Sequence, residues 1–100
     1  MNFLDNFSIA ISNLCKMHKV NRLYAFGSVL TDRFDAESDI DLIVDFQAID
    51  VLDYADNYFD FKFSLQDVLH RPIDLLEEKA IKNPYFQQNL HQKKQLLYEQ

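Results

Sequence analysis

The sequence has very few of the residues that interrupt regular structure or cross-link a chain. Its 100 residues include one glycine, two prolines, one cysteine and no tryptophan. The single Cys15 cannot form an internal disulfide, so a disulfide-stapled fold is excluded and a reducing compartment is the simplest interpretation. Hydrophobic residues make up 48% of the chain and aromatic residues 14%, enough for one folded core. We therefore expect a single domain spanning residues 1–100, with Cys15 packed inside it.

Long apolar segments and a leader-like start are also lacking. No run approaches the roughly 18–20 apolar residues that a helix needs to cross a bilayer. The first residues, MNFLDNF, lack the basic segment and apolar stretch of a secretory signal. The expected location is therefore cytoplasmic, without membrane attachment.

Positive charge is scarce in the middle of the chain. Residues 32–60 hold ten acids and one arginine, so this segment has a formal charge of −9. The net charge of the whole chain is −6, so the remaining residues are slightly positive. Tight binding to a nucleic-acid backbone requires clustered Lys and Arg, so we do not expect it. A metal-chelated nucleotide is compatible with this charge, because two Mg²⁺ ions would bring about +4.

Hydrophobic spacing predicts an α/β fold class with seven alternating elements, α-β-α-β-α-β-α. The expected helices are 2–19, 28–33, 51–69 and 83–98, and the expected strands are 22–26, 40–46 and 72–76. The strand at 40–46 is apolar enough to lie at the centre of a sheet, covered on both faces. Asp50 is expected to cap the following helix, and Asn83 with Pro84 to begin the last one.

Three acids at strand positions form the candidate metal site. Asp39 and Asp41 are two residues apart on one strand, so their side chains point the same way with Cα atoms roughly 6.5–7 Å apart. Asp74 interrupts the apolar run PIDLL, where an unpaired buried charge would cost several kcal/mol. Mg²⁺ in proteins is held by one or two carboxylates together with substrate phosphates. We expect Asp39, Asp41 and Asp74 to bind two Mg²⁺ ions and to be the catalytic residues.

The only glycine marks the candidate phosphate site. Gly27 ends a strand and is followed by Ser28, so the backbone could approach a phosphate without a Cβ in the way. The amides of the short helix expected after it would favour an anion, and the Ser28 hydroxyl could donate a further hydrogen bond. Ser38 and Arg33 are further candidate nucleotide-binding residues. Taken singly, each feature could be an ordinary turn, a solvated strand entry or a salt-bridged acid; their occurrence together at three strand ends favours a site.

These motifs resemble the minimal nucleotidyltransferases of the DNA polymerase β-like superfamily. The family mark is a Gly-Ser pair, ten residues, then Asp-x-Asp, found here as Gly27-Ser28 followed by Asp39-Ile40-Asp41. The likeness continues through the Ile73-Asp74-Leu75 strand and the Asn83-Pro84-Tyr85 helix start, and so covers nearly the whole chain.

The resemblance implies a mixed three-stranded sheet flanked by helices, with Mg²⁺ and ATP as cofactor and substrate. It also implies a HEPN-type helical partner, an RNase toxin to which the nucleotidyltransferase acts as antitoxin by transferring AMP to a hydroxyl, plausibly of a tyrosine. The oligomeric state is not determined by the sequence, and a homo-oligomer is one alternative. A haloacid dehalogenase phosphatase, which also uses Asp-x-Asp, fits poorly, because there the motif follows a strand.

One segment departs from the family pattern. Many relatives have an arginine and a glycine after the Gly-Ser pair, whereas this chain has Val29-Leu30-Thr31-Asp32, with Arg33 just beyond. This departure supports an alternative: a weak or inactive nucleotide-binding module that neutralises a partner by binding it.

Other residues receive less specific interpretations. We expect His70 and Arg71 to interact with the C-terminal dipole of the preceding helix. Lys93-Lys94 is expected to be a solvated face. Tyr54, Tyr58 and Phe59 fit either core packing or a partner surface.

Overall fold

A four-stranded mixed sheet is the framework of the fold. The computed structural model describes the backbone of residues 3–100 and the side chains of 3–89 and 93–100. The strands are β1 (Val20–Phe26), β2 (Ile40–Phe46), β3 (Ile73–Glu77) and β4 (Gln95–Glu99). The α-helices are α1 (Ser8–Met17), α2 (Val51–Leu69) and α3 (Pro84–Lys93), and the 3-10 helices are η1 (Phe3–Phe7), η2 (Gly27–Leu30) and η3 (Glu78–Ala80).

The strand order is β3-β2-β1-β4. β1 pairs antiparallel with both β2 and β4, whereas β2 and β3 are parallel. The α/β class and the mixed sheet are therefore confirmed, and β2 lies inside the sheet, with every residue except Asp41 buried. The expected number of three strands is wrong by one, because the C-terminal segment adds β4.

The last predicted helix, 83–98, was too long. α3 ends at Lys93, and Lys94 is already extended, with φ −96° and ψ 150°. The following segment pairs with β1, whose outer edge would otherwise present unpaired backbone N–H and C=O groups. Leu97 and Tyr98 then pack against the core, while Leu96 remains 47% exposed. Leu97 and Tyr98, whose spacing suggested a longer helix, therefore belong to a strand.

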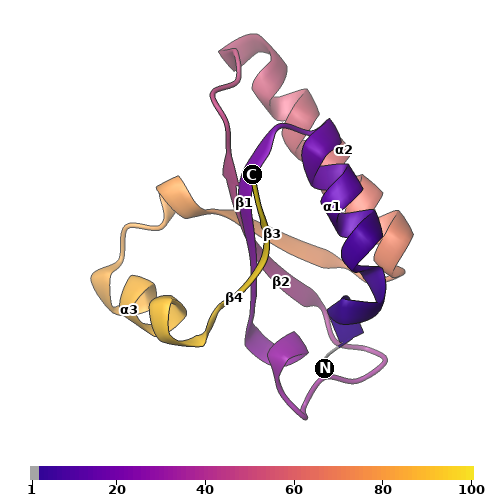
Figure 1. The fold of residues 1–100 in the computed structure, drawn as a ribbon. Coiled ribbons are helices and arrows are strands. Elements are labelled where there is room, and N and C mark those ends of the chain that lie inside the picture. Colours follow the sequence, from indigo (N-terminus) through magenta and orange to yellow (C-terminus); the bar gives the residue numbers. More distant parts are fainter. Residues whose placement is uncertain (1–2) are drawn as a thin grey trace.

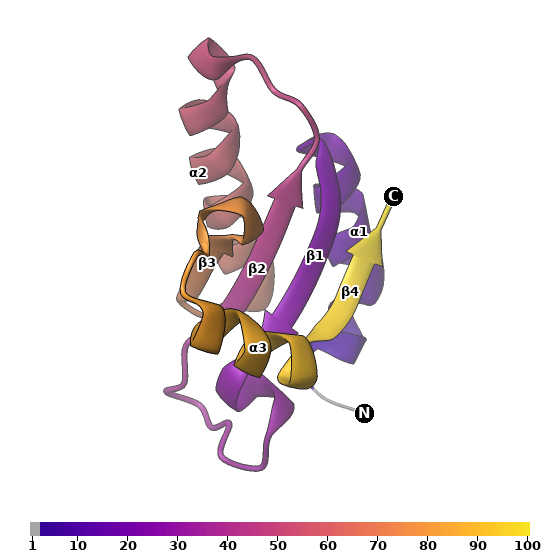
Figure 2. The same ribbon diagram turned by 90° about the vertical axis from the view of Figure 1, so that its left-hand side faces the viewer.

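The sheet has helices on both sides. Figure 1 shows α1 and α2 side by side on one face and α3 on the other, and Figure 2 shows α3 crossing in front of the sheet near η2. The main core lies between the sheet and the α1–α2 layer, and α2 contributes Phe61, Leu65 and Leu69 to it. Cys15, from α1, is fully buried there as expected. No helix in the described part of the chain combines the length and apolarity needed to cross a membrane.

Helix ends follow the predicted capping residues. The Asp50 carboxylate accepts a hydrogen bond from the backbone N–H of Leu52, and α2 spans residues 51–69 as expected. Asn83 caps α3 by accepting from two backbone N–H groups, with Pro84 at the first helical position. The expected helix 2–19 is instead a 3-10 turn followed by α1, and its residue 2 lies outside the described residues.

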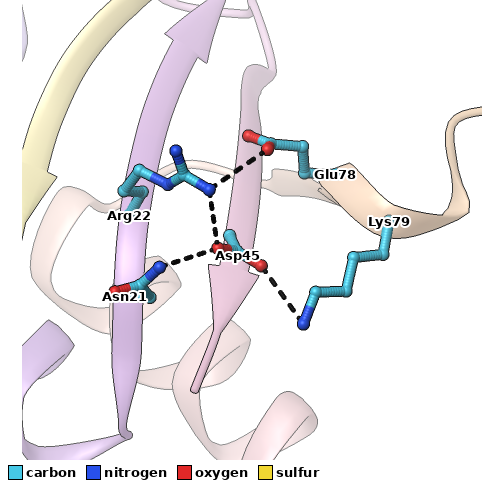
Figure 3. A network of polar contacts seen from close by, with 5 residues as sticks. All are labelled: Asn21, Arg22, Asp45, Glu78 and Lys79. Atoms are coloured by element: carbon cyan, nitrogen blue, oxygen red, sulfur yellow. Dashed lines mark hydrogen bonds and ion pairs between the residues drawn. The ribbon is translucent and has the colours of Figure 1, made fainter. Parts of the chain in front are cut away.

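A network of polar contacts around the buried Asp45 joins η3 to the centre of the sheet (Figure 3). The Asp45 carboxylate, 5% exposed, accepts hydrogen bonds from Asn21 Nδ2 at 2.9 Å and Arg22 Nη2 at 3.1 Å. Lys79 Nζ lies 3.6 Å from its other oxygen, and Glu78 lies 3.6 Å from the same Arg22 nitrogen. Burial raises the pKa of Asp45, but these hydrogen bonds and positive charges together lower it by more, so its net pKa is below normal. Asp45 therefore stays ionised and holds β1, β2 and η3 together.

Candidate active site

The three predicted acids come together at one end of the sheet. Asp41 in β2 and Asp74 in β3 are direct partners in the parallel register, and Asp39 precedes Asp41 by two residues. Ile40 and Ile73, the residues just before them, point into the core beneath α1 and α2. Because side chains alternate along a strand, Asp41 and Asp74 project from the opposite face, the side on which α3 lies.

The charge on these acids is not neutralised by the protein. No Lys, Arg or His of the described residues forms an ion pair with Asp39, Asp41 or Asp74. Burial raises the pKa of Asp41, and the neighbouring charges of Asp74 and Asp39 raise it further. Adjacent carboxylates without a cation repel one another, which is the electrostatic condition that a bound divalent cation relieves.

Gly27 lies directly against this acidic group. Its φ is +77°, a left-handed conformation, and a Cβ built on it would lie 2.6 Å from Asp41 Oδ2. Only glycine meets both conditions without strain. The Gly-Ser turn and the first carboxylate of β2 are therefore packed together, with Phe26 of β1 as the register partner of Asp41.

The expected helix 28–33 is shorter than predicted. η2 spans only four residues, and the Ser28 carbonyl accepts hydrogen bonds from the Thr31 backbone N–H and hydroxyl, each at 2.9 Å. A single 3-10 turn has no developed helix dipole, so any phosphate binding here would rest on individual backbone N–H groups and side chains.

A pocket of about 500 Å³ opens beside this turn. It is lined by Gly27, Ser28, Leu30, Thr31, Arg33 and Lys93. The volume lies within the roughly 300–1,000 Å³ usual for small-molecule sites. Arg33, a predicted nucleotide-binding residue, thus lines the pocket beside the Gly-Ser turn. Lys93, expected to be merely solvated, lines the same pocket from the end of α3.

The loop that carries Asp39 is held by Arg71. The Arg71 guanidinium lies over the rings of Phe3 and Phe34, 5.2 and 4.7 Å from their centroids. Its Nη1 donates to the backbone carbonyls of Asp35 and Ser38, at 2.6 and 3.2 Å. We expected Arg71 to interact with the helix dipole, and that expectation did not include these contacts. The rings and carbonyls that hold Arg71 come from segments distant in the sequence.

The predicted ligand Ser38 is engaged within that loop. Its hydroxyl donates to the Asp35 carboxylate at 3.1 Å and accepts from the Asp35 backbone N–H at 3.0 Å. The hydrogen bond from the Glu37 backbone N–H to the Asp35 carboxylate, followed by the one from the Ser38 hydroxyl, lowers the pKa of Asp35. Ser38 thereby orders the chain immediately before Asp39; a contact with nucleotide stays a prediction.

The acids fit Mg²⁺ by donor chemistry, although not as a closed cage. Within residues 3–89 and 93–100, no three His, Cys, Asp or Glu side chains are arranged to hold a metal by themselves. Mg²⁺ commonly takes one or two protein carboxylates and completes its octahedron with water and substrate phosphates. The uncompensated pair Asp41 and Asp74, with Asp39 nearby, suits such a site, in which the nucleotide would supply the remaining ligands.

The Gly27 turn packs against carboxylates that no protein cation neutralises, and a pocket of nucleotide size opens beside it. This combination is typical of a nucleotidyltransferase site. The family described as "Polymerase beta, Nucleotidyltransferase" matches residues 10–100. The chain therefore belongs to this family, and it is a nucleotidyltransferase.

Individual relatives agree with this assignment. The Methanocaldococcus jannaschii protein named "Putative protein adenylyltransferase MJ0128" is 33% identical over 79 residues, which cover 79% of this chain and 78% of that protein. A solved structure described as a "putative minimal nucleotidyltransferase" superposes with a TM-score of 0.76 at 25% identity, covering 95% of both chains.

A more distant structural neighbour is a tri-AMPylated Shewanella oneidensis HEPN toxin in complex with its MNT antitoxin. It has a TM-score of 0.65 and 18% identity, and the match covers 96% of this chain and 72% of that one. At this identity the likeness supports the fold alone.

Proposed function

We propose that this protein is a Mg²⁺-dependent nucleotidyltransferase that uses ATP to transfer AMP to a hydroxyl of a partner protein. The observation that carries the proposal is the convergence of Asp39, Asp41 and Asp74 beside the left-handed Gly27 turn. Carboxylates alone suit many sites, but carboxylates in contact with a turn open to phosphate suit a metal-bound triphosphate.

Each residue has a part in the proposed reaction. Asp39 and Asp41 would hold Mg²⁺, and Asp74, on the neighbouring strand, would be the third ligand. When bound, Mg²⁺ supplies charge neutralisation at the phosphoryl oxygens and lowers the pKa of the acceptor hydroxyl. Backbone N–H groups at Gly27 and Ser28 orient the phosphates.

The bond changes balance without a covalent enzyme intermediate. The acceptor oxygen forms a bond to the α-phosphorus of ATP while the bond from that phosphorus to the β-bridging oxygen breaks. Pyrophosphate leaves, and the acceptor proton passes to a site carboxylate or to solvent. Catalysis would then rest on positioning and on stabilising the charge that develops on the leaving group.

The proposed partner is a HEPN-type helical protein, to which this chain would be the antitoxin. The relatives support this choice: one neighbour contains an AMPylated HEPN toxin with an MNT antitoxin, and another is described as a toxin-antitoxin with AMP-PNP. The target hydroxyl would be a tyrosine of that toxin, and the chemistry would inactivate it.

The experiment uses ATP labelled at either the α- or the γ-phosphate, with a HEPN-type helical protein as the partner. Label from the α-phosphate should become acid-stable on the partner, and label from the γ-phosphate should not. Asp39→Asn should abolish transfer, while Asp67→Asn, which alters an exposed acid of α2 away from the site, should leave it unchanged. Failure of the wild-type protein to label the partner, or equal labelling by Asp39→Asn, would overturn the proposal.

A second candidate is a binding module that neutralises its partner by occlusion. It is favoured by Val29-Leu30-Thr31-Asp32, where the family pattern has an arginine. Rescue of cells from toxicity by a folded Asp39→Asn/Asp41→Asn variant would support this function. Loss of rescue by that variant would reject it.

A further inference from the structure

The end of α3 brings a lysine to the phosphate turn. In the antiparallel ladder between β1 and β4, Ala25 is the partner of Gln95. This pair lies two residues before Gly27 and two residues after Lys93, so the end of the ladder brings the η2 turn and the end of α3 near each other. The pocket beside the turn is indeed lined by both Gly27 and Lys93. Lys93 therefore lies close to the turn because β4, which follows α3 directly, is paired with the end of β1.

The charge of Lys93 is available to a ligand. Within the described part of the chain, Lys93 takes part in none of the ion pairs, whereas Lys79 pairs with Asp45. The neighbouring Lys94 is engaged differently, with its ammonium 4.1 Å from the centroid of the Tyr24 ring. Arg33 also lines the pocket and likewise takes part in none of the ion pairs of the described residues. Two cations thus face one cavity that contains no acid among its lining residues.

These two cations can replace the arginine that the family pattern has after the Gly-Ser pair and that this chain lacks there. A triphosphate needs positive charge near its outer phosphates, where the leaving group develops negative charge. Val29 and Leu30 cannot provide it, and Asp32 would oppose it. A lysine from the C-terminal helix and an arginine from the loop can provide it together, since both ammonium and guanidinium groups bind phosphate oxygens strongly.

We propose that Lys93 is a triphosphate-binding residue: with Arg33, it neutralises the β- and γ-phosphates of the nucleotide at the Gly27–Ser28 turn and selects ATP over AMP. This inference rests on the proposed function and assigns the specificity of that same site. Lys93 is not required to exchange a proton or to touch the acceptor. Its effect is on binding of the outer phosphates and on stabilising pyrophosphate as it leaves.

The test compares binding of the ATP analogue AMP-PNP with binding of AMP, each with Mg²⁺ and without any acceptor protein, by isothermal titration calorimetry. Lys93→Ala should weaken AMP-PNP binding about tenfold, as expected for loss of one charge-assisted contact, and leave AMP binding unchanged. Lys93→Arg should restore most of the affinity. The matched control Lys94→Ala removes an adjacent lysine held over Tyr24 and should bind both ligands as the wild type does.

Two results would overturn the inference by itself: wild-type AMP-PNP affinity in Lys93→Ala, or an equal loss of AMP and AMP-PNP binding. Equal weakening by Lys94→Ala would also overturn it, because the effect would then be general surface charge. If the wild-type protein binds neither ligand, the proposed function fails together with the inference. Because Lys93 is exposed, the Ala variant should unfold at the wild-type temperature, which circular dichroism can verify.

Discussion

Replacing Gly27 with alanine should damage the site more than the fold. The left-handed φ of +77° costs a residue with a Cβ about 1–2 kcal/mol. The new Cβ would also lie 2.6 Å from Asp41 Oδ2, so the carboxylate must move by about 0.8 Å to reach ordinary contact at 3.4 Å. A misplacement near 1 Å in a catalytic group costs on the order of 10²-fold in rate. We expect a loss of 1–2 kcal/mol in unfolding free energy and a roughly hundredfold loss of nucleotide transfer.

A second substitution separates the two effects. Asparagine tolerates the left-handed conformation better than alanine does but carries the same Cβ. Gly27→Asn should therefore recover part of the stability and none of the activity. Urea denaturation gives the first quantity and transfer of α-labelled phosphate the second. The reasoning would be refuted if Gly27→Ala transferred AMP at the wild-type rate, or if Gly27→Asn restored transfer along with stability.

Three further predictions concern residues around the site and core. Arg71→Ala should lower the unfolding free energy by about 1–2 kcal/mol and expose the loop 31–39 to limited proteolysis, because its contacts with Phe3 and Phe34 are lost; unchanged cleavage would contradict this. The pKa of Asp45 is lower in the folded protein than in the unfolded chain, where it is near 4. The contribution of Asp45 to the free energy of unfolding is therefore complete above that unfolded-state pKa and is lost as the pH falls through the folded-state pKa. Asp45→Asn should make the free energy of unfolding fall less steeply with decreasing pH. Burial raises the pKa of the Cys15 thiol to about 12, so it should react with a thiol reagent at pH 8 only in denaturant, and rapid labelling of the native protein would count against the packing.

Local signals in the sequence were enough to predict much of the framework. The limits of α2, its Asp50 cap, and the Asn83-Pro84 start of α3 depend on neighbouring residues, and all three were predicted correctly. The buried β2 was equally clear, since an apolar run bounded by acids fits few other structures. The grouping of Asp39, Asp41 and Asp74 followed from strand periodicity and from the family spacing, although their catalytic and metal roles stay predictions.

The features that were missed depend on distant parts of the chain. Whether residues 95–99 extend a helix or form a strand is decided by the unpaired edge of β1, some seventy residues earlier in the sequence. Lys93 lies in α3, within the predicted helix, but its nearness to Gly27 depends on the pairing of the residues after it with β1. Likewise, Arg71 is held by Phe3, Phe34 and two loop carbonyls that no local pattern connects to it.

The most direct test of the account is intact-mass spectrometry of the HEPN-type partner, co-expressed with this protein. With the wild-type chain, the account predicts that the partner gains mass in steps of one AMP, mapped by fragmentation to a hydroxyl side chain. With Asp39→Asn/Asp41→Asn, the partner should remain unmodified although the variant is folded. An unmodified partner in the presence of the wild-type chain, or equal modification by the double variant, would contradict the claim that these carboxylates transfer a nucleotide.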